Sequence, residues 1–213
     1  PDMPYKWAGG TSSVWTDTAN WQNNVVPTKG ANVEIAAGTY YPVLTADLDL
    51  NTSLGSTPYN GIITVDSDAT FDLGGQNVTA GQIINNGRVR LTGVSSPAQT
   101  LTFTRTNNTD SIVEYYGTGS SITNFAWGQI YEKLEINESA EIHTALSINK
   151  TTAITAASTK TVMLDSTANV FTGNVILGTA ASSTGNVTLA ANGLITLENN
   201  ANASSLTIQT AAN

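Results

Sequence analysis

The sequence predicts an all-β protein: a right-handed parallel β-solenoid with an N-terminal cap that is rich in tryptophan. Three observations lead to this prediction. Helical apolar periodicity is missing from the 213 residues, short apolar triplets recur along the chain, and charged residues make up only 11% of it. Surface helices place charged residues on their wet face, and an average soluble protein contains about 25% of them. The 33 Thr, 22 Asn, 18 Ser and 18 Gly residues favour strands and turns instead.

The N-terminal segment of the chain predicts the cap. It contains Trp7, Trp15 and Trp21, which are three of the four tryptophans in the chain, together with three prolines. A solenoid end has an unpaired strand edge and an open apolar core, so it needs a covering segment. We therefore expect residues 1–30 to form the cap and residues 31–213 to form the coils.

Twelve triplets, in which two apolar residues flank a middle residue, predict the strands of the coils. In a strand the flanking residues share one face and the middle residue lies on the other. Turn-forming residues separate the triplets, and with ~20 residues per coil the region after Ala31 would hold about eight or nine coils. Antiparallel sandwiches have similar spacing, but Asn-Gly turns occur only three times. The triplets are residues 33–35, 48–50, 71–73, 89–91, 101–103, 134–136, 146–148, 162–164, 175–177, 187–189, 195–197 and 206–208.

A second aromatic cluster predicts an excursion from the coils at about residues 115–131. Its members are Tyr115, Tyr116, Phe125, Trp127 and Tyr131. Loops on a rigid scaffold often bind ligands, and flat aromatic faces suit sugar rings. Tyr115, Tyr116, Trp127 and Tyr131 are therefore the candidate ligand-binding residues, and packing within the protein is the alternative that stays open.

The tryptophan segment resembles a W-x-G-G…W…NW…P…V-x-I pattern of bacterial cell-surface, autotransporter-like β-helix proteins of the adhesin type. Residues 71–79, 84–93, 114–119 and 131–136 are similar to recurring pieces of such proteins. The resemblance implies an adhesin, sheath or stalk role and carries over no catalytic residue. The residues that match the tryptophan pattern are 6–10, 14–15, 19–21, 26–27 and 32–35.

Three acidic residues form a candidate Ca²⁺ site. Asp66, Asp68 and Asp72 lie close together in the sequence and offer the oxygen ligands that Ca²⁺ prefers. The pattern lacks the glycine and the closing glutamate of an EF-hand loop, so no metal site is predicted. The alternative is a solvated corner followed by one outward strand residue.

Arg88 and Arg90 flank Val89 and should share one outward face. Solenoid polysaccharide lyases use a basic residue beside acidic Ca²⁺ ligands, and Asp72 is expected one coil away. The alternative is a charged strip that discourages lateral association of sheets.

Charge and composition exclude several function classes. The net charge is −8, and eight Lys and Arg residues cannot form a phosphate-binding stripe, so nucleic acid is not an expected partner. No apolar run approaches the ~20 residues of a membrane span. His143, the single histidine, is expected on the surface, which argues against His-based zinc sites and Ser-His-Asp triads. We expect no cofactor.

These observations together predict a non-enzymatic structural or adhesive segment of a bacterial surface or secreted protein, located outside the cell. Its partners would be a host or neighbouring-cell surface, with a glycan among the candidates, and further coils of its own parent chain. The triplets run to residue 208 without a second cap, so we expect a longer protein. The alternatives are a carbohydrate-binding module that uses the aromatic loop and a solenoid polysaccharide lyase or hydrolase.

Overall fold

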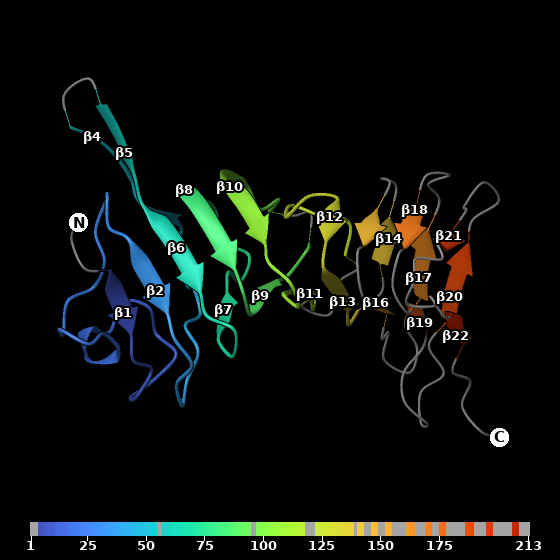
Figure 1. Cartoon of the computed structure of the whole chain (residues 1–213), viewed down its shortest axis with the longest axis horizontal. Coiled ribbons are helices and arrows are strands. Elements are labelled where there is room, and N and C mark those ends of the chain that lie inside the picture. Colours follow the sequence, from blue (N-terminus) through green and yellow to red (C-terminus); the bar gives the residue numbers. More distant parts are fainter. Residues whose placement is uncertain are drawn as a thin grey trace. The chain divides into compact units, whose positions relative to one another are not determined.

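The computed structural model describes most of the N-terminal two thirds of the chain and short strands beyond it. Within these residues every element is a strand except one 3-10 turn, η1 (Thr18–Asn20). The prediction of an all-β parallel solenoid is confirmed, and each of the twelve predicted triplets overlaps a strand (Figure 1). The described residues are 4–54, 57–94, 97–117, 122–138, 140–142, 146–148, 152–154, 161–164, 169–171, 175–177, 186–189, 195–197 and 206–208.

The chain divides into two compact units. The first comprises Pro1–Arg90 and Gln99–Ser111, and the second comprises Leu91–Ala98 and Ile112–Asn213.

The first unit is built on a parallel sheet in which successive coils lie side by side. Val33 pairs with Ile63, and Ile63 pairs with Ile83, so the coil from β2 to β6 is longer than the coil from β6 to β8. The inward-facing Ile35, Ile63 and Ile83 are fully buried, which gives the sheet its core face. The sheet runs in the order β1 (Tyr5–Trp7), β2 (Val33–Ile35), β6 (Ile62–Val65), β8 (Val78–Asn85) and β10 (Leu101–Asn107).

Other strands of the first unit complete the coils. β3 (Leu48–Asp49) pairs with β8, and β7 (Thr70–Asp72) pairs with β9 (Arg88–Leu91), in both cases parallel. β4 (Asn51–Leu54) and β5 (Thr57–Asn60) instead form an antiparallel hairpin, which extends beyond the sheet in Figure 1. The triplet rule did not predict this hairpin, and its insertion explains why the coil between β2 and β6 is long.

The second unit consists of three parallel stacks of short strands. Leu134 pairs with Thr152, whereas Val175 pairs with the more distant Leu206, so the coil length varies widely within one stack. The first stack holds β11 (Ile112–Tyr115), β13 (Lys133–Ile136), β16 (Thr152–Ile154), β19 (Val175–Leu177) and β22 (Leu206–Ile208). The second holds β12 (Ile130–Tyr131), β15 (Ser147–Ile148), β18 (Asn169–Phe171) and β21 (Ile195–Leu197), and the third holds β14 (Ala140–Ile142), β17 (Thr161–Leu164) and β20 (Asn186–Leu189).

The tryptophan segment covers the edge of β1, as an N-terminal cap should. Trp7 and Trp21 form an antiparallel bridge, and the Gln22 amide donates to the Lys6 carbonyl at 3.0 Å. Trp7, Trp15 and Trp21 are buried and pack on one another, with 4.8 Å between the ring centroids of Trp15 and Trp21. β1 itself pairs with β2, so the coils begin inside the segment that was predicted to be cap alone.

A fully buried asparagine holds the cap loop in place. The Asn20 side-chain oxygen accepts from the Ser12 and Thr11 amides, and its nitrogen donates to the Ser12 hydroxyl and the Val14 carbonyl. A buried polar group is tolerated only when its hydrogen bonds are made. Asn20 therefore fixes the loop that carries Trp15 and Trp21.

Candidate functional site

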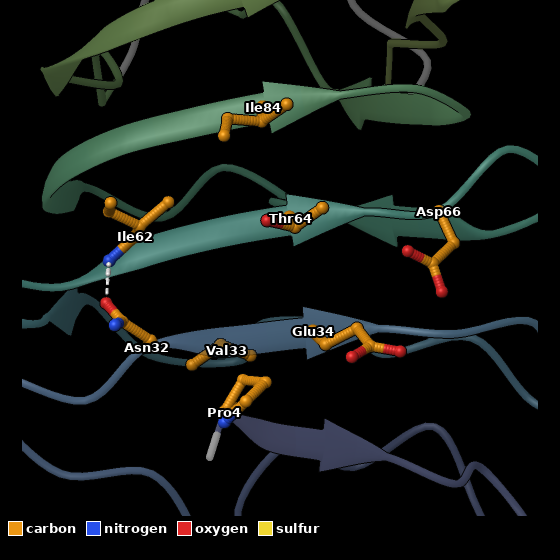
Figure 2. Close-up of a pocket in the computed structure, with 8 residues that line it drawn as sticks. All are labelled: Pro4, Asn32, Val33, Glu34, Ile62, Thr64, Asp66 and Ile84. Atoms are coloured by element: carbon orange, nitrogen blue, oxygen red, sulfur yellow. Dashed lines mark hydrogen bonds between the residues drawn. The ribbon is translucent and has the colours of Figure 1, made fainter. Parts of the chain in front are cut away.

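A groove of about 380 Å³ lies on the outer face of the parallel sheet in the first unit. Strand alternation turns Glu34, Thr64 and Ile84 outward, and the strand register places them in one row across β2, β6 and β8. Figure 2 shows this row with the rest of the lining. The lining residues are Pro4, Asn32, Val33, Glu34, Ile62, Thr64, Asp66 and Ile84.

One end of the groove is aliphatic. Ile62 and Pro4 line this end, and Ile84 continues the apolar wall into the middle row beside Thr64. Ile62 and Ile84 are only partly covered by the protein. The Asn32 side-chain oxygen accepts a hydrogen bond from the Ile62 amide at 3.0 Å (Figure 2). This bond links the start of β2 to β6.

The opposite end of the groove is acidic. Ile35 pairs with Val65, so Glu34 on β2 and Asp66 just after β6 come together although they belong to successive coils. Their carboxyl groups lie at the same end of the groove in Figure 2. Lys6 is in register with Glu34 and forms an ion pair with it. This cluster, the Lys6–Glu34–Asp66 trio, therefore combines two acids with one base.

Electrostatics single out Asp66 within the trio. Burial raises the pKa of Asp66 above its usual value of 3.8, and the Glu34 carboxylate raises it further, while Lys6 opposes the shift. The hydrogen bond and charge of Glu34 in turn raise the pKa of Lys6. The Lys6 ammonium forms its ion pair with Glu34. Within the trio, the negative charge of Asp66 is therefore the less compensated of the two.

No sequence pattern indicated this groove. The coil that separates Glu34 from Asp66 is longer than the coils that the triplets predicted, because the β4–β5 hairpin is inserted in it. The sequence contains the apolar run at residues 62–65, but it does not give the register that pairs this run with residues 33–35 and so places Glu34 beside Asp66.

The predicted aromatic residues lie mostly in the interior. Tyr115, Trp127 and Tyr131 are buried, and only Tyr116 is partly exposed. The Trp127 amide donates to the Tyr115 hydroxyl at 3.1 Å, and the Tyr115 and Tyr131 ring centroids are 6.5 Å apart. This placement favours the packing alternative, because three of the four rings offer no open face. Ligand binding by these residues stays a prediction.

Arg90 and Asp72 lie one coil apart, as the sequence suggested. Asp72 pairs with Arg90 in the register of β7 and β9, and their side chains form an ion pair at 3.0 Å. The Arg90 guanidinium also donates to the Tyr41 hydroxyl at 2.9 Å, and the Gly74 amide donates to Asp72 at 2.8 Å. Each charge of this pair, the Asp72–Arg90 pair, is therefore matched inside the protein.

The three aspartates of the candidate Ca²⁺ site lie in different environments. Asp66 faces Glu34, Asp68 is exposed, and Asp72 is buried against Arg90. In the described part of the chain, no three acidic, His or Cys side chains gather as metal ligands would. His143 lies outside the described residues.

Comparisons with protein-family models, curated proteins and solved structures give no match to this chain. Among the described residues, none belongs to a helix that is long and apolar enough to span a membrane.

Proposed function

We propose that this chain is a non-enzymatic structural or adhesive segment of a bacterial surface or secreted protein. One observation carries the proposal: polar side chains, most of them at least partly exposed, join one coil to the next. These pairs are Lys6–Glu34, Lys29–Asp49, Asp47–Asn77, Asp72–Arg90, Gln82–Thr106 and Asn86–Asn108 in the first unit and Glu114–Asn137 in the second.

One such ladder runs over three coils. Asn77 donates to Asp47 through its backbone at 2.8 Å and through its side chain at 3.0 Å. The Asn77 side-chain oxygen then accepts from the Thr100 amide at 2.8 Å. A ladder of this kind stiffens the stack along its axis, and stacked repeats offer long binding surfaces. This use of polar groups suits a spacer or an adhesive scaffold.

A hydrolase or lyase receives less support. Glycoside hydrolysis uses two carboxyl groups that act directly on the sugar or on a water. Of the two carboxyl groups in the groove, that of Glu34 is already held in an ion pair with Lys6. Arg90, the candidate lyase base, is already matched by Asp72.

A carbohydrate-binding module is the other alternative. It relied on a platform of Tyr115, Tyr116, Trp127 and Tyr131, of which three are buried. A glycan would therefore need another surface, or an opening of the second unit. This weakens the alternative relative to an adhesive scaffold.

The cysteine-free composition and the resemblance to adhesin-type surface proteins support an extracellular location. The partners proposed with it are a host or neighbouring-cell surface and further coils of the parent chain.

Cell adhesion and polysaccharide turnover test this proposal together. Beads coated with the folded chain should bind to bacterial or host cells, and beads coated with the heat-unfolded chain should not. Incubation with a panel of polysaccharides should release neither reducing ends nor unsaturated uronates. Catalytic release of either product would overturn the proposal, as would equal binding by both kinds of bead. Glycan-array binding confined to one sugar class would instead favour the carbohydrate-binding alternative.

A further inference from the structure

The groove on the first unit has two chemically different ends, which together suit one kind of ligand. Lys and Arg side chains have the same two parts, since they lay an apolar stem on apolar surface and place a charged head in polar surroundings. We propose that the groove binds a Lys or Arg side chain from a basic segment of a partner protein. The stem would lie along Ile62 and Ile84, and the cationic head would lie beside Glu34 and Asp66 (Figure 2). This inference rests on the proposed adhesive function and names the chemistry of the partner.

The dimensions of the groove match a single extended side chain with its neighbouring backbone. From Ile62 to Asp66 the chain advances four residues, which corresponds to about 13 Å in a strand. The volume of about 380 Å³ falls at the small end of ligand sites, which run from about 300 to 1,000 Å³. The groove is thus large enough for an anchor residue and too small for a folded element.

Charge complementarity favours a cation. Lys6 supplies one positive charge to two carboxyl groups, and its ammonium pairs with Glu34. A second cation beside Asp66 would balance the trio in the way that Arg90 balances Asp72. The raised pKa of Asp66 agrees with this, because its ionised form is under-compensated in the free protein. The net charge of −8 also attracts basic partners and repels a second copy of this chain.

The walls of the groove favour a methylene stem over a sugar ring. None of the eight lining residues is aromatic, whereas flat aromatic faces are the surfaces that sugar rings stack on. The Asn32 side-chain oxygen already accepts a hydrogen bond from the Ile62 amide, and Pro4, Ile62 and Ile84 offer no polar side-chain atom to a sugar hydroxyl group. Aliphatic side chains such as Ile62 and Ile84 pack well against an aliphatic stem.

An NMR titration of the ¹⁵N-labelled full chain tests the proposal. The probe is a short peptide with one central lysine between two isoleucines, acetylated and amidated so that the lysine carries its only charge. Its control has norleucine in place of lysine, which keeps the stem and removes the cation. We expect the lysine peptide to shift the amides of Glu34, Thr64 and Asp66, and the norleucine peptide to bind at least tenfold more weakly, because a charged hydrogen bond is lost.

Three variants locate the site. Asp66→Asn should weaken lysine-peptide binding roughly tenfold or more, since it removes the uncompensated charge. Asp68→Asn is the matched control: it removes the same charge two residues away, at an exposed position outside the lining, and should change affinity less than twofold. Thr64→Phe fills the middle of the groove without changing its charge and should weaken both peptides.

Several outcomes would overturn the proposal. Equal losses in the two aspartate variants would mean diffuse attraction to an acidic surface. Equal affinity for the two peptides would mean an apolar site, and binding of glucosamine oligomers without the lysine peptide would mean a sugar site. Unchanged spectra throughout would mean that the groove takes no such ligand. None of these results alters the adhesion and turnover assays, so the proposed function would stand or fall separately.

Discussion

The first unit contains two charged clusters that differ in their ratio of acidic to basic side chains. The Asp72–Arg90 pair has one charge of each sign, and the Asp72 side chain is only 5% exposed. The Lys6–Glu34–Asp66 trio has two acids for one base and lies at the end of an open groove, with the Glu34 side chain 26% exposed. Both clusters form in the same way: a polar residue on the outer face of one coil contacts a charged residue of the next coil.

In a stacked fold of this kind, some charged side chains hold neighbouring coils together and others are left to bind a ligand. A matched pair that is withdrawn from solvent holds two coils together and has no charge left for a ligand. An unmatched carboxyl group beside apolar walls weakens the fold slightly and leaves a place for a cation. We therefore expect substitutions in the two clusters to affect stability in opposite directions.

The largest effect is expected from breaking the matched pair. Arg90→Ala leaves the buried Asp72 carboxylate without its guanidinium, and loss of one partner from a buried pair costs about 3 kcal/mol or more. Urea unfolding followed by tryptophan fluorescence measures the change. The double variant Asp72→Asn/Arg90→Gln should recover part of the loss, and a single Arg90→Ala variant as stable as the wild type would contradict the structural role of the pair.

The next effect concerns the turn that presents Asp66. A Cβ at Gly87 would lie 2.2 Å from the Asp66 carbonyl oxygen and 2.4 Å from that of Ala69. Gly87→Ala should therefore push this turn outward at a cost of about 1–3 kcal/mol, as overpacking does. It should also weaken lysine-peptide binding without changing any charge. Gly10→Ala is the matched control, because a Cβ there meets nothing within 4 Å.

A smaller effect of opposite sign is expected at the trio. Asp66→Asn removes a carboxyl group whose ionised form is disfavoured by burial and by Glu34. At pH 7 the variant should equal or slightly exceed the wild type in unfolding free energy, within about 0.5 kcal/mol. A clear destabilisation would show that the Asp66 carboxylate is structural, which would remove the contrast between the two clusters.

The smallest effect is the pH dependence, which has opposite signs at Asp66 and Asp49. The folded pKa of Asp66 is raised, so its contribution to stability is present below about pH 3.8 and is lost as the pH rises through the folded value. The pKa of Asp49 is lowered by Lys29 and the Asn51 amide, so its contribution is present above about pH 3.8 and is lost as the pH falls through the lowered value. Unfolding of Asp66→Asn and Asp49→Asn between about pH 2.5 and 7 should thus give difference curves of opposite slope, and parallel curves would contradict the assignment.

Local sequence was sufficient for the fold class. Alternation in triplets such as residues 33–35 and 206–208 sets which side chains face inward, and this depends only on the two-residue period of a strand. The same reasoning placed Asp72 one coil from Arg90, because β7 and β9 are joined without an inserted hairpin and the coil has its usual length. It also predicted that Trp7, Trp15 and Trp21 would be covered, since a solenoid end must bury its apolar core.

Tertiary structure alone decided which polar groups meet and which aromatic rings are hidden. The inserted hairpin β4–β5 changes one coil length, so the meeting of Glu34 with Asp66 depends on a long-range register that no local pattern encodes. Likewise, the sequence left open whether Tyr115 and Tyr131 pack within the protein or bind a ligand from a loop, and only the structure shows that both are buried and pack on each other. The physical reason is the same in both cases: alternation determines the face of a side chain, whereas its neighbours on that face come from other coils at distances set by every intervening turn.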